Sequence, residues 1–323
     1  MMKQLLQLDP AHYERHSIHR AERDWAETNC YVDIWIELLH AWGFEPIAAM
    51  PFTLGIDFEG DQWTFFKFPH ADLYDLYGLD VQELQIWRPL VTHVEEQVAL
   101  GRPILVELDS FHLPDTAGTA YQLAHVKSTV AIVEIDAAAQ HLGYFHGQGY
   151  YHVDGADFVN VLRLNETNPA MLAPYVEIVK RRQAAAPRAD ALVQTSLQLL
   201  RRQLDRLPAV NPFEKFKAQF AIDMNWLAKE SLEMFHQYSF ATLRQFGACY
   251  EQSATYLRWL QVCTDKPLDR AITAFAELSS GAKTLQFHLA RMMARKKPID
   301  LASLDQLAEK WAAGMSELKA IFL

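Results

Sequence analysis

The sequence predicts an α+β amino-terminal domain followed by an all-helical carboxy-terminal domain. Helical and strand patterns alternate over the first half of the 323-residue chain, whereas strand patterns stop beyond Asn168 and helical periodicity continues to the end. Half of the residues are hydrophobic and 22% are charged, which is typical of a folded protein with a substantial core. We therefore predict two domains, residues 1–165 and residues 166–323.

The first clear element is a helix in TNCYVDIWIELLHAWG, residues 28–43. Its apolar side chains recur at helical spacing around most of its circumference, and Asp33, Glu37 and His40 form one narrow polar stripe. Such a pattern indicates a helix that is mostly buried. Gly43 is expected to end it.

The same helix is predicted to carry Cys30 in its first turn, because Thr28 or Asn29 can serve as its N-cap. Unpaired backbone N–H groups and the helix dipole stabilise a thiolate at this position. The alternative interpretation is that Cys30 is simply a small buried hydrophobic residue, which is a common use of free cysteine.

The following elements combine loops, one helix and three strands. Gly and Pro breaks predict loops and short elements over residues 51–78, and a helix around residues 91–100 is expected to end at Gly101. PILVELDSF predicts a short buried strand, and HVKSTVAIVEID, residues 125–136, is an almost continuous β-prone run. HLGYFHGQGYYHV, after an AAAQ turn, is its expected hairpin partner.

The second half shows helical patterns throughout. The segments expected to form a helical bundle are MLAPYVEIVKRRQ, ALVQTSLQLLRRQLDRL, FEKFKAQFAIDMNWLAKESLEMF, ATLRQFGACYEQSATYLRWLQVC, the run to Ala294, and LASLDQLAEKWAAGMSELKAIF.

Charge is distributed unevenly between the halves. Residues 1–160 hold 8 Lys and Arg against 24 Asp and Glu, whereas residues 161–323 hold 22 against 16. An acidic first half argues against nucleic acid as a partner. The basic runs of the second half, at residues 180–182, 201–202 and 295–297, are expected to be solvated helix faces or a docking surface for an acidic carrier protein.

The three cysteines are Cys30, Cys249 and Cys263, which form no CxxC pair and argue against a disulfide framework. Cys249 and Cys263 lie among helix-core residues and are expected to be buried. The amino-terminal apolar stretch is too short and interrupted for a signal peptide, and no segment has the uncharged length of a membrane span. We therefore expect a cytoplasmic protein in a reducing compartment, with no membrane partner.

The predicted order of elements is that of the papain-like fold. A helix that begins with a cysteine is followed by loops, a strand, a strand that begins with His125, and a further strand. In the papain-like arrangement the nucleophile lies at the helix amino-terminus, and the histidine base comes from the start of a later strand.

Three motifs in this order resemble the amino-terminal domain of the butirosin biosynthesis protein H family: NCYVDIWIELLHAWG, GRPILVELDSFHLP and AHVKSTVAIVEID. The likeness covers about residues 29–151, and the whole chain also resembles an uncharacterised bacterial family associated with amino acid:carrier protein ligases. The resemblance implies an acyltransferase that moves an acyl or aminoacyl group from the phosphopantetheine thioester of a carrier protein to an amine acceptor. The phosphopantetheine arm is then part of a substrate, and no tightly bound cofactor is expected.

The resemblance implies a catalytic pair of Cys30 as nucleophile and His125 as general base and acid. The Cys30 backbone N–H, with Asn29, is the candidate oxyanion hole. The group that orients His125 stays open between Asp109 and Asp136.

The strand after His125 departs from the pattern of relatives with this fold, which usually carry Asp or Asn there. GYFHGQG offers His146 instead, in a bend where a polar residue is often structural.

Other chemistry is less well supported. His12, His16 and His19 have a helical spacing, but no carboxylate pair accompanies them, so no metal site is predicted. The aromatic residues of the segment 62–68 are expected to form core or to line an acyl pocket. Two alternative functions use the same fold: a cysteine peptidase or amidase with water as acceptor, and a non-catalytic binding protein.

Overall fold

A computed structural model describes residues 2–25, 28–166, 171–183, 186–295 and 301–323. It divides into two compact units. Unit 1 comprises residues 1–21, 29–46 and 70–187, and unit 2 comprises residues 22–28, 47–69 and 188–323. The predicted boundary at residues 165/166 is therefore displaced, and two short segments of the first half belong to unit 2.

Unit 1 contains one antiparallel sheet of seven strands in the order β2-β7-β3-β4-β5-β6, with β1 paired to β4. Its strands are β1 (Lys3–Gln4), β2 (Leu79–Glu83), β3 (Ile104–Asp109), β4 (Lys127–Asp136), β5 (His141–His146), β6 (Gly149–Asp154) and β7 (Val176–Arg181). The predicted strands of the first half are confirmed, and β5 and β6 together form the hairpin partner of β4.

Strand β7 contradicts the prediction that MLAPYVEIVKRRQ is helical. It lies between β2 and β3 and pairs antiparallel with both. The run Val176–Val179 contains three β-branched residues, which favour a strand, and Pro174 disfavours a helix immediately before it. The segment is therefore the last strand of unit 1, not the first helix of unit 2.

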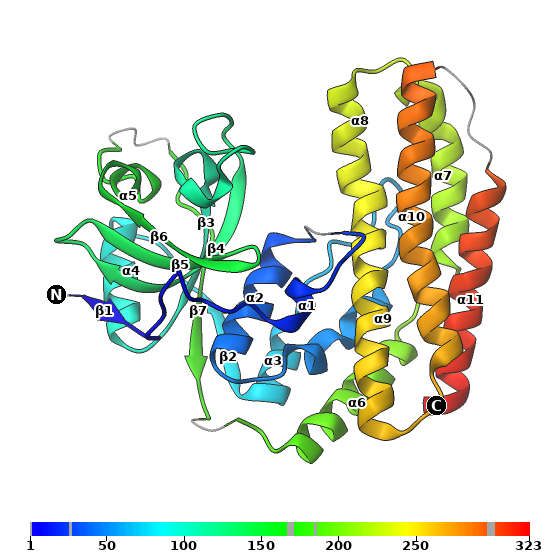
Figure 1. The fold of residues 1–323 in the computed structure, drawn as a ribbon, viewed down its shortest axis with the longest axis horizontal. Helices are drawn as coiled ribbons and strands as arrows, with labels where there is room; N and C mark the ends of the chain where they lie inside the picture. The colour runs from blue at the N-terminus through cyan, green and yellow to red at the C-terminus, as the bar shows by residue number, and fades with distance from the viewer. Residues whose placement is uncertain (1, 26–27, 167–170, 184–185, 296–300) are drawn as a thin grey trace. The chain divides into compact units, whose positions relative to one another are not determined.

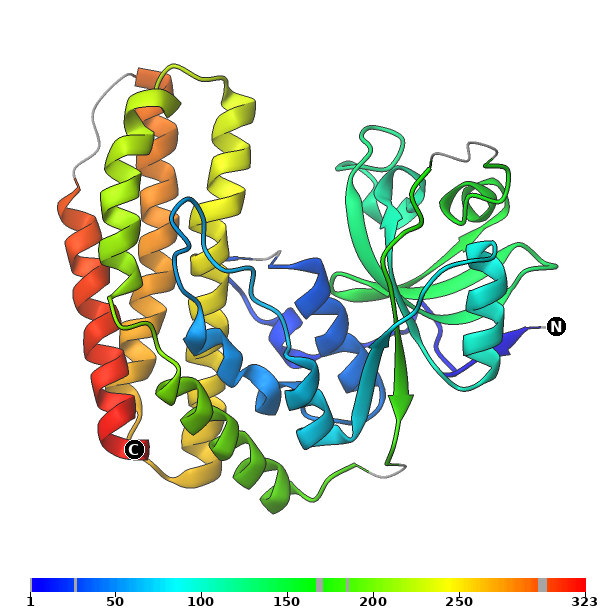
Figure 2. The same cartoon turned by 180° about the vertical axis from the view of Figure 1, so that it is seen from behind.

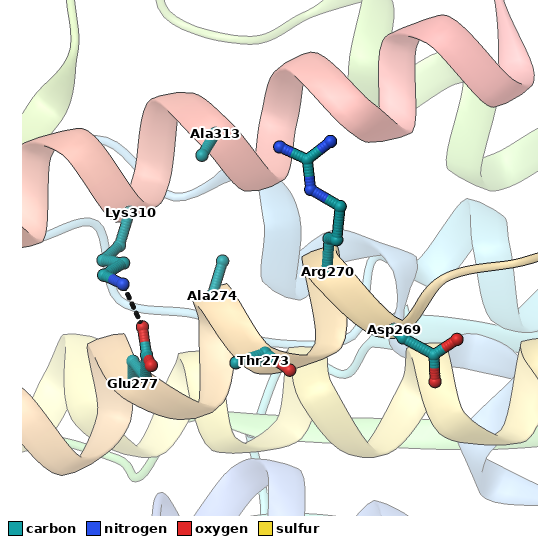
Figure 3. A pocket seen from close by; sticks show the side chains of 7 residues that line it. All are labelled: Asp269, Arg270, Thr273, Ala274, Glu277, Lys310 and Ala313. Carbon is teal, nitrogen blue, oxygen red and sulfur yellow. Dashed lines mark ion pairs between the residues drawn. The ribbon is translucent and has the colours of Figure 1, made fainter.

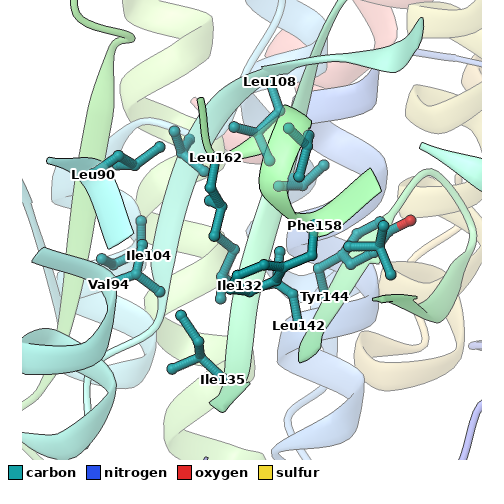
Figure 4. Close-up of a cluster of buried hydrophobic side chains, with 14 of the residues drawn as sticks. Leu90, Val94, Ile104, Leu108, Ile132, Ile135, Leu142, Tyr144, Phe158 and Leu162 are labelled. Carbon is teal, nitrogen blue, oxygen red and sulfur yellow. The ribbon is translucent and has the colours of Figure 1, made fainter. Parts of the chain in front are cut away.

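One face of the sheet carries the hydrophobic core of unit 1. Side chains of alternate residues, such as Ile104 and Ile132, pack there against helices α4 (Leu90–Ala99) and α5 (Gly155–Val161) (Figure 4). We call this the core face. The short helix α1 (Ser17–Arg20) also belongs to unit 1, as does α3 (His70–Tyr77).

The other face of the same sheet carries α2 (Cys30–Ala41), which contacts β4 and β5, and we call it the α2 face. The predicted helix is confirmed, with Asn29 as its N-cap and a left-handed Gly43 (φ +75°) just after it. Asp33 and Glu37 of the expected polar stripe are themselves buried, because His19 of α1 covers them. Figure 1 shows α2 among the blue elements of the unit.

Unit 2 is a helical bundle. Long helices of this unit run side by side in Figure 1 and in the view from behind in Figure 2. Its helices are α6 (Ala189–Asp205), α7 (Pro212–Leu227), α8 (Leu232–Ser239), α9 (Gln245–Thr264), α10 (Asp269–Arg295) and α11 (Ala302–Phe322). A π-helical turn, Phe240–Arg244, joins α8 to α9, and most of the 3₁₀ segment Pro46–Gly55 also belongs to this unit.

Candidate functional site

Cys30 is the first residue of α2, as its sequence context predicts. The Asn29 side-chain oxygen accepts hydrogen bonds from the Tyr31 N–H at 3.0 Å and the Val32 N–H at 3.4 Å, so it serves as the helix cap. The Cys30 side chain is half-buried, and its Sγ lies 3.7 Å from the Thr129 Oγ1 of β4. A partly exposed thiol in the first turn of a helix is the environment that favours a reactive thiolate.

The pairing of strands places Cys30 on the α2 face. Thr129 is paired with Glu107, and such partners in an antiparallel sheet point to the same side. Val106 and Val130, one residue away on each strand, point to the core face and pack beneath α4 and α5. Cys30 is therefore separated from the core face by the sheet itself.

His125 immediately precedes β4 and pairs with a carboxylate. Its Nδ1 lies 2.6 Å from the Asp109 Oδ2, and its ring stacks on Phe111 with centroids 4.5 Å apart. Burial would raise the pKa of Asp109, but the His125 hydrogen bond and the Phe111 N–H outweigh it and hold that pKa below its usual value. The structure thus brings His125 together with Asp109, one of its two expected orienting residues.

Asp136 does not contact His125. It ends β4, about 30 Å along the strand from Lys127, and accepts a hydrogen bond from the Ala139 N–H in the hairpin turn. His146, the candidate offered by the strand after His125, pairs with Asp115. Its Nδ1 lies 2.5 Å from the Asp115 Oδ2, and the buried Tyr144 hydroxyl donates to the other oxygen of the same carboxylate.

The structure does not place Cys30 and His125 in hydrogen-bond contact with each other. Cys30 contacts Thr129, which is four residues beyond His125, or about 13 Å of extended chain. His125 and Asp109 instead line a cavity of about 430 Å³ with His112 and with residues of α5, including Asn160. The cavity lies at the carboxyl end of β3, beside α5.

A second imidazole and carboxylate lie on the α2 face, and sequence patterns gave no signal for them. His70, the first residue of α3, has its Nε2 at 3.3 Å from the Glu177 Oε1 of β7 and at 2.9 Å from the Tyr31 hydroxyl. That hydroxyl donates to the Glu177 Oε2 at 2.7 Å, and Tyr175 donates to Oε1 at 2.9 Å. Tyr31 follows Cys30 directly, so this group is linked to the first turn of α2.

Glu177 is almost fully buried, with 1% of its side chain exposed. Burial raises the pKa of this carboxyl, but the hydrogen bonds from His70, Tyr31 and Tyr175 lower it to a net value below the usual one. The Glu177 carboxylate therefore lies beside the His70 imidazole with its Oε1 at 3.3 Å from Nε2. The segment around Glu177 was missed because it was interpreted as a helix.

The remaining predicted residues have structural surroundings. Cys249 is buried and donates to the Thr53 carbonyl oxygen, but Cys263 is exposed, contrary to expectation. His12 is paired with Asp9 on the surface, whereas His16 and His19 lie close to Glu37 in the interior of unit 1.

The aromatic segment 62–68 contributes to the core of unit 2, where Trp63 packs against Phe213 and Phe246. This packing supports the expectation that the segment forms part of a hydrophobic core.

The basic runs do not form one surface of the helical unit. Residues 180–182 lie in unit 1 at the end of β7 and just after it, where Arg182 pairs with Asp80 and Arg181 lies over the Trp42 ring. Arg201 of α6 donates to the Phe322 carbonyl oxygen, and Lys296 and Lys297 lie outside the described residues. The expected placement of residues 180–182 on the helical half is therefore wrong, and docking of a carrier protein on the other basic runs stays a prediction.

Unit 2 has a shallow hollow of about 350 Å³ between α10 and α11. Figure 3 shows Arg270 and Thr273 on one helix, Ala313 on the other, and the ion pair of Lys310 with Glu277 at its side. Small side chains and charged side chains that pair with each other line this hollow, and they do not form a catalytic site.

No helix in the described part of the chain is both long and apolar enough to span a membrane. No curated protein matches the chain. Family models match nearly all of it: the DUF1839 N-terminal domain over residues 14–181 and the DUF1839 C-terminal domain over residues 189–320. The first match ends with β7, and the second begins with α6, in agreement with the larger segments of the two units. The chain belongs to the DUF1839 family.

Proposed function

We propose that unit 1 is a papain-like acyltransferase that moves an acyl or aminoacyl group from a carrier-protein phosphopantetheine thioester to an amine, with Cys30 as nucleophile. The observation that carries the proposal is the position of the thiol. Cys30 begins a helix that packs on an antiparallel sheet, and its side chain is half-buried, not sealed in a core. The resemblance of the surrounding motifs to the butirosin biosynthesis protein H family supplies the donor class.

The proposed chemistry exchanges one thioester for another and then forms an amide. The Cys30 thiolate attacks the donor carbonyl, the new C–S bond forms, and the phosphopantetheine thiolate leaves and takes up a proton. The acceptor amine then attacks the enzyme thioester. Its nitrogen forms the C–N bond, its extra proton passes to a base, and the Cys30 thiolate leaves.

His70 is the best supported base for this chemistry, in place of His125. It shares the α2 face with Cys30, its side chain is about one-third exposed, and Glu177 orients it from the interior. Tyr31 connects its Nε2 to the helical turn that carries the thiol. A carboxylate that orients an imidazole toward a nucleophile is the arrangement used by catalytic triads.

A second mechanism is favoured by the cavity at His125. The His125–Asp109 pair lines a space of about 430 Å³, which is large enough for a small acceptor. In that mechanism His125 deprotonates the acceptor amine, and the amine attacks the carrier thioester directly. No covalent adduct forms on Cys30.

The function is tested by incubating the protein with acyl and aminoacyl carrier thioesters, with and without a panel of amines. Amide formation that is lost in Cys30→Ser supports cysteine-dependent transfer, and loss only in His125→Gln supports direct transfer. Thioester loss with water as the sole acceptor indicates the hydrolase alternative. No thioester consumption by the wild type, with any donor tested, would contradict both transfer mechanisms.

A further inference from the structure

Glu134, His141 and His152 form a cluster at the far end of β4 from Cys30. In the described chain, they are the one group of three whose ligand atoms have a spacing suited to a metal ion, all within 4.8 Å of one another. The His141 Nε2 lies 3.4 Å from the Glu134 Oε1, and the His152 Nε2 lies 3.8 Å from the Glu134 Oε2. Zinc bonds of about 2.0–2.1 Å at tetrahedral angles separate neighbouring ligand atoms by roughly 3.4 Å.

The strand register explains why these three side chains converge. A register shift between Ile132 and Glu134 forms a bulge in β4, which places Glu134 opposite Gly143 of β5. Gly143 is in turn paired with His152 of β6. Its missing side chain leaves the space that the cluster uses, because a Cβ there would lie 2.9 Å from the Glu134 Cβ and 2.2 Å from the Tyr150 hydroxyl.

His141 is oriented as a metal ligand. Its Nδ1 lies 2.6 Å from the Asp154 Oδ1, so a neutral ring donates its Nδ1–H to Asp154 and leaves a lone pair on Nε2. That Nε2 is buried, has no hydrogen-bond partner in the described chain, and faces the Glu134 carboxylate. Two electron-pair donors that face each other require a cation or a proton between them.

Glu134 is held by further hydrogen bonds. Its side chain is 3% exposed, the Tyr150 hydroxyl donates to its Oε2 at 2.6 Å, and the Gln4 amide donates to the same oxygen at 3.1 Å. These contacts fix the carboxylate and leave Oε1 directed at His141. Support of ligands by outer hydrogen bonds is typical of protein metal sites, and the His152 Nε2 also lies 3.3 Å from the Tyr150 hydroxyl that donates to Glu134.

We propose that Glu134, His141 and His152 bind one divalent transition-metal ion of the zinc class. Two imidazole nitrogens and one carboxylate oxygen suit zinc, cobalt or iron(II) and do not suit magnesium or calcium. Three protein ligands leave at least one coordination position for water or a small ligand, as in catalytic zinc sites. The site does not depend on the proposed acyl transfer, since Thr129 at Cys30 is five residues, about 17 Å of strand, from Glu134.

The test is metal binding by the full chain after treatment with a chelator. We expect one equivalent of Zn²⁺ or Co²⁺ per chain by calorimetry and elemental analysis, with Co²⁺ giving the intense visible bands of a four-coordinate site. We expect His152→Asn and Glu134→Gln each to weaken Zn²⁺ binding by ~10–100-fold or more. Asp154→Asn, which changes the partner of His141 Nδ1, should weaken it within a similar range.

His125→Gln is the matched control, because His125 has the same Nδ1–carboxylate distance of 2.6 Å but lies outside the Glu134, His141 and His152 cluster. This variant should bind metal as the wild type does. Circular dichroism of each metal-free variant shows whether it is folded. If His152→Asn is not folded, the conservative variant His152→Gln takes its place. Absence of stoichiometric uptake by the wild type, or uptake that survives His152→Asn and Glu134→Gln together, would overturn the proposal and leave a buried histidine–carboxylate ion pair.

Discussion

The Cys30 thiol lies 3.7 Å from the Thr129 hydroxyl, and this contact determines which face of the sheet carries the nucleophile. Thr129 is the residue of β4 that the Cys30 side chain contacts. His125 precedes it by four residues and lies with Asp109 at a cavity beside α5. A further imidazole lies on the α2 face at His70, whose partners are Glu177 and Tyr31.

The three thiols should differ in reactivity. Cys249 is fully buried, and burial raises its pKa well above the usual value, so it should resist iodoacetamide in the native protein. Cys263 is exposed and supplies an internal reference for an ordinary surface thiol. We expect Cys30 to react faster than Cys263 at pH 7 despite its lower exposure, because it lies in the first turn of α2. Peptide mass spectrometry over a time course measures both rates, and a slower Cys30 would indicate a structural thiol.

The two imidazoles should have separable effects on transfer. If His70 serves Cys30, His70→Ala should lower the rate of transfer by at least ~100-fold, while His125→Ala changes it by less than ~10-fold. Glu177→Gln should lower the rate less than His70→Ala does, because it removes the charge that supports the imidazole and keeps the shape. Single-turnover rates with a saturating carrier thioester make the comparison, and the reverse order of the two histidines would favour direct transfer at the His125 cavity.

The buried group around His19 should control the pH dependence of stability. Burial lowers the pKa of His19, but hydrogen bonds to Asp33 and Glu37 outweigh it and raise the net value above 6.5. Because the pKa of His19 is higher in the folded state than in the unfolded state, the protonated imidazole stabilises the fold. This contribution is complete below about pH 6.5, the pKa of an unfolded histidine, and is lost as the pH rises through the higher pKa of the folded state. Thermal unfolding from pH 6 to pH 9 should show a decline that is absent in His19→Gln.

The same group predicts the size of a stability loss. His19→Ala leaves two buried carboxylates without their cation and should reduce the free energy of unfolding by about 3–5 kcal/mol at pH 6. His12→Ala is the control, because His12 pairs with Asp9 in solvent, where such pairs contribute about 0–1 kcal/mol. Chemical denaturation of both variants measures the difference. Equal losses would mean that the His19 group contributes little.

The Asp109 carboxyl should report whether the His125 pair forms in solution. The His125 hydrogen bond lowers the pKa of Asp109 against the opposing effect of burial. His125→Gln should therefore raise that pKa toward or above the usual 3.8, which carboxyl-carbon NMR titration measures directly. An unchanged pKa would show that the contact contributes nothing in solution.

Local patterns predicted the elements of unit 1 better than its site. The helix at Cys30 and the strands β3 to β6 followed from apolar periodicity, N-cap chemistry and turn residues, all of which act over a few neighbouring residues. The strand β7 was missed, because a short buried run has no periodicity that separates strand from helix. Without β7 in the predicted sheet, the position of Glu177 cannot be predicted. Glu177 accepts a hydrogen bond from Tyr31, from which it is separated by 146 residues of sequence.

Cys30 contacts Thr129 and not His125 for a related reason. The order of the strands predicts which strand passes the amino-terminus of α2. It does not predict which residue of that strand lies there, and a difference of four residues places Thr129, not His125, beside Cys30. The Glu134 cluster was also invisible to local patterns. It depends on the bulge at Val133 and on Gly143, which together bring residues from three strands into one space.

The most direct test of the central claim is the mass of the protein after it reacts with a carrier thioester. The account predicts that rapid acid quenching, followed by intact-mass and peptide analysis, finds one acyl group attached to Cys30. The adduct should disappear when an acceptor amine is added, and it should be absent from Cys30→Ser. Amide formation by wild type without any adduct on Cys30, or by Cys30→Ser at an undiminished rate, would contradict the claim that Cys30 is the nucleophile.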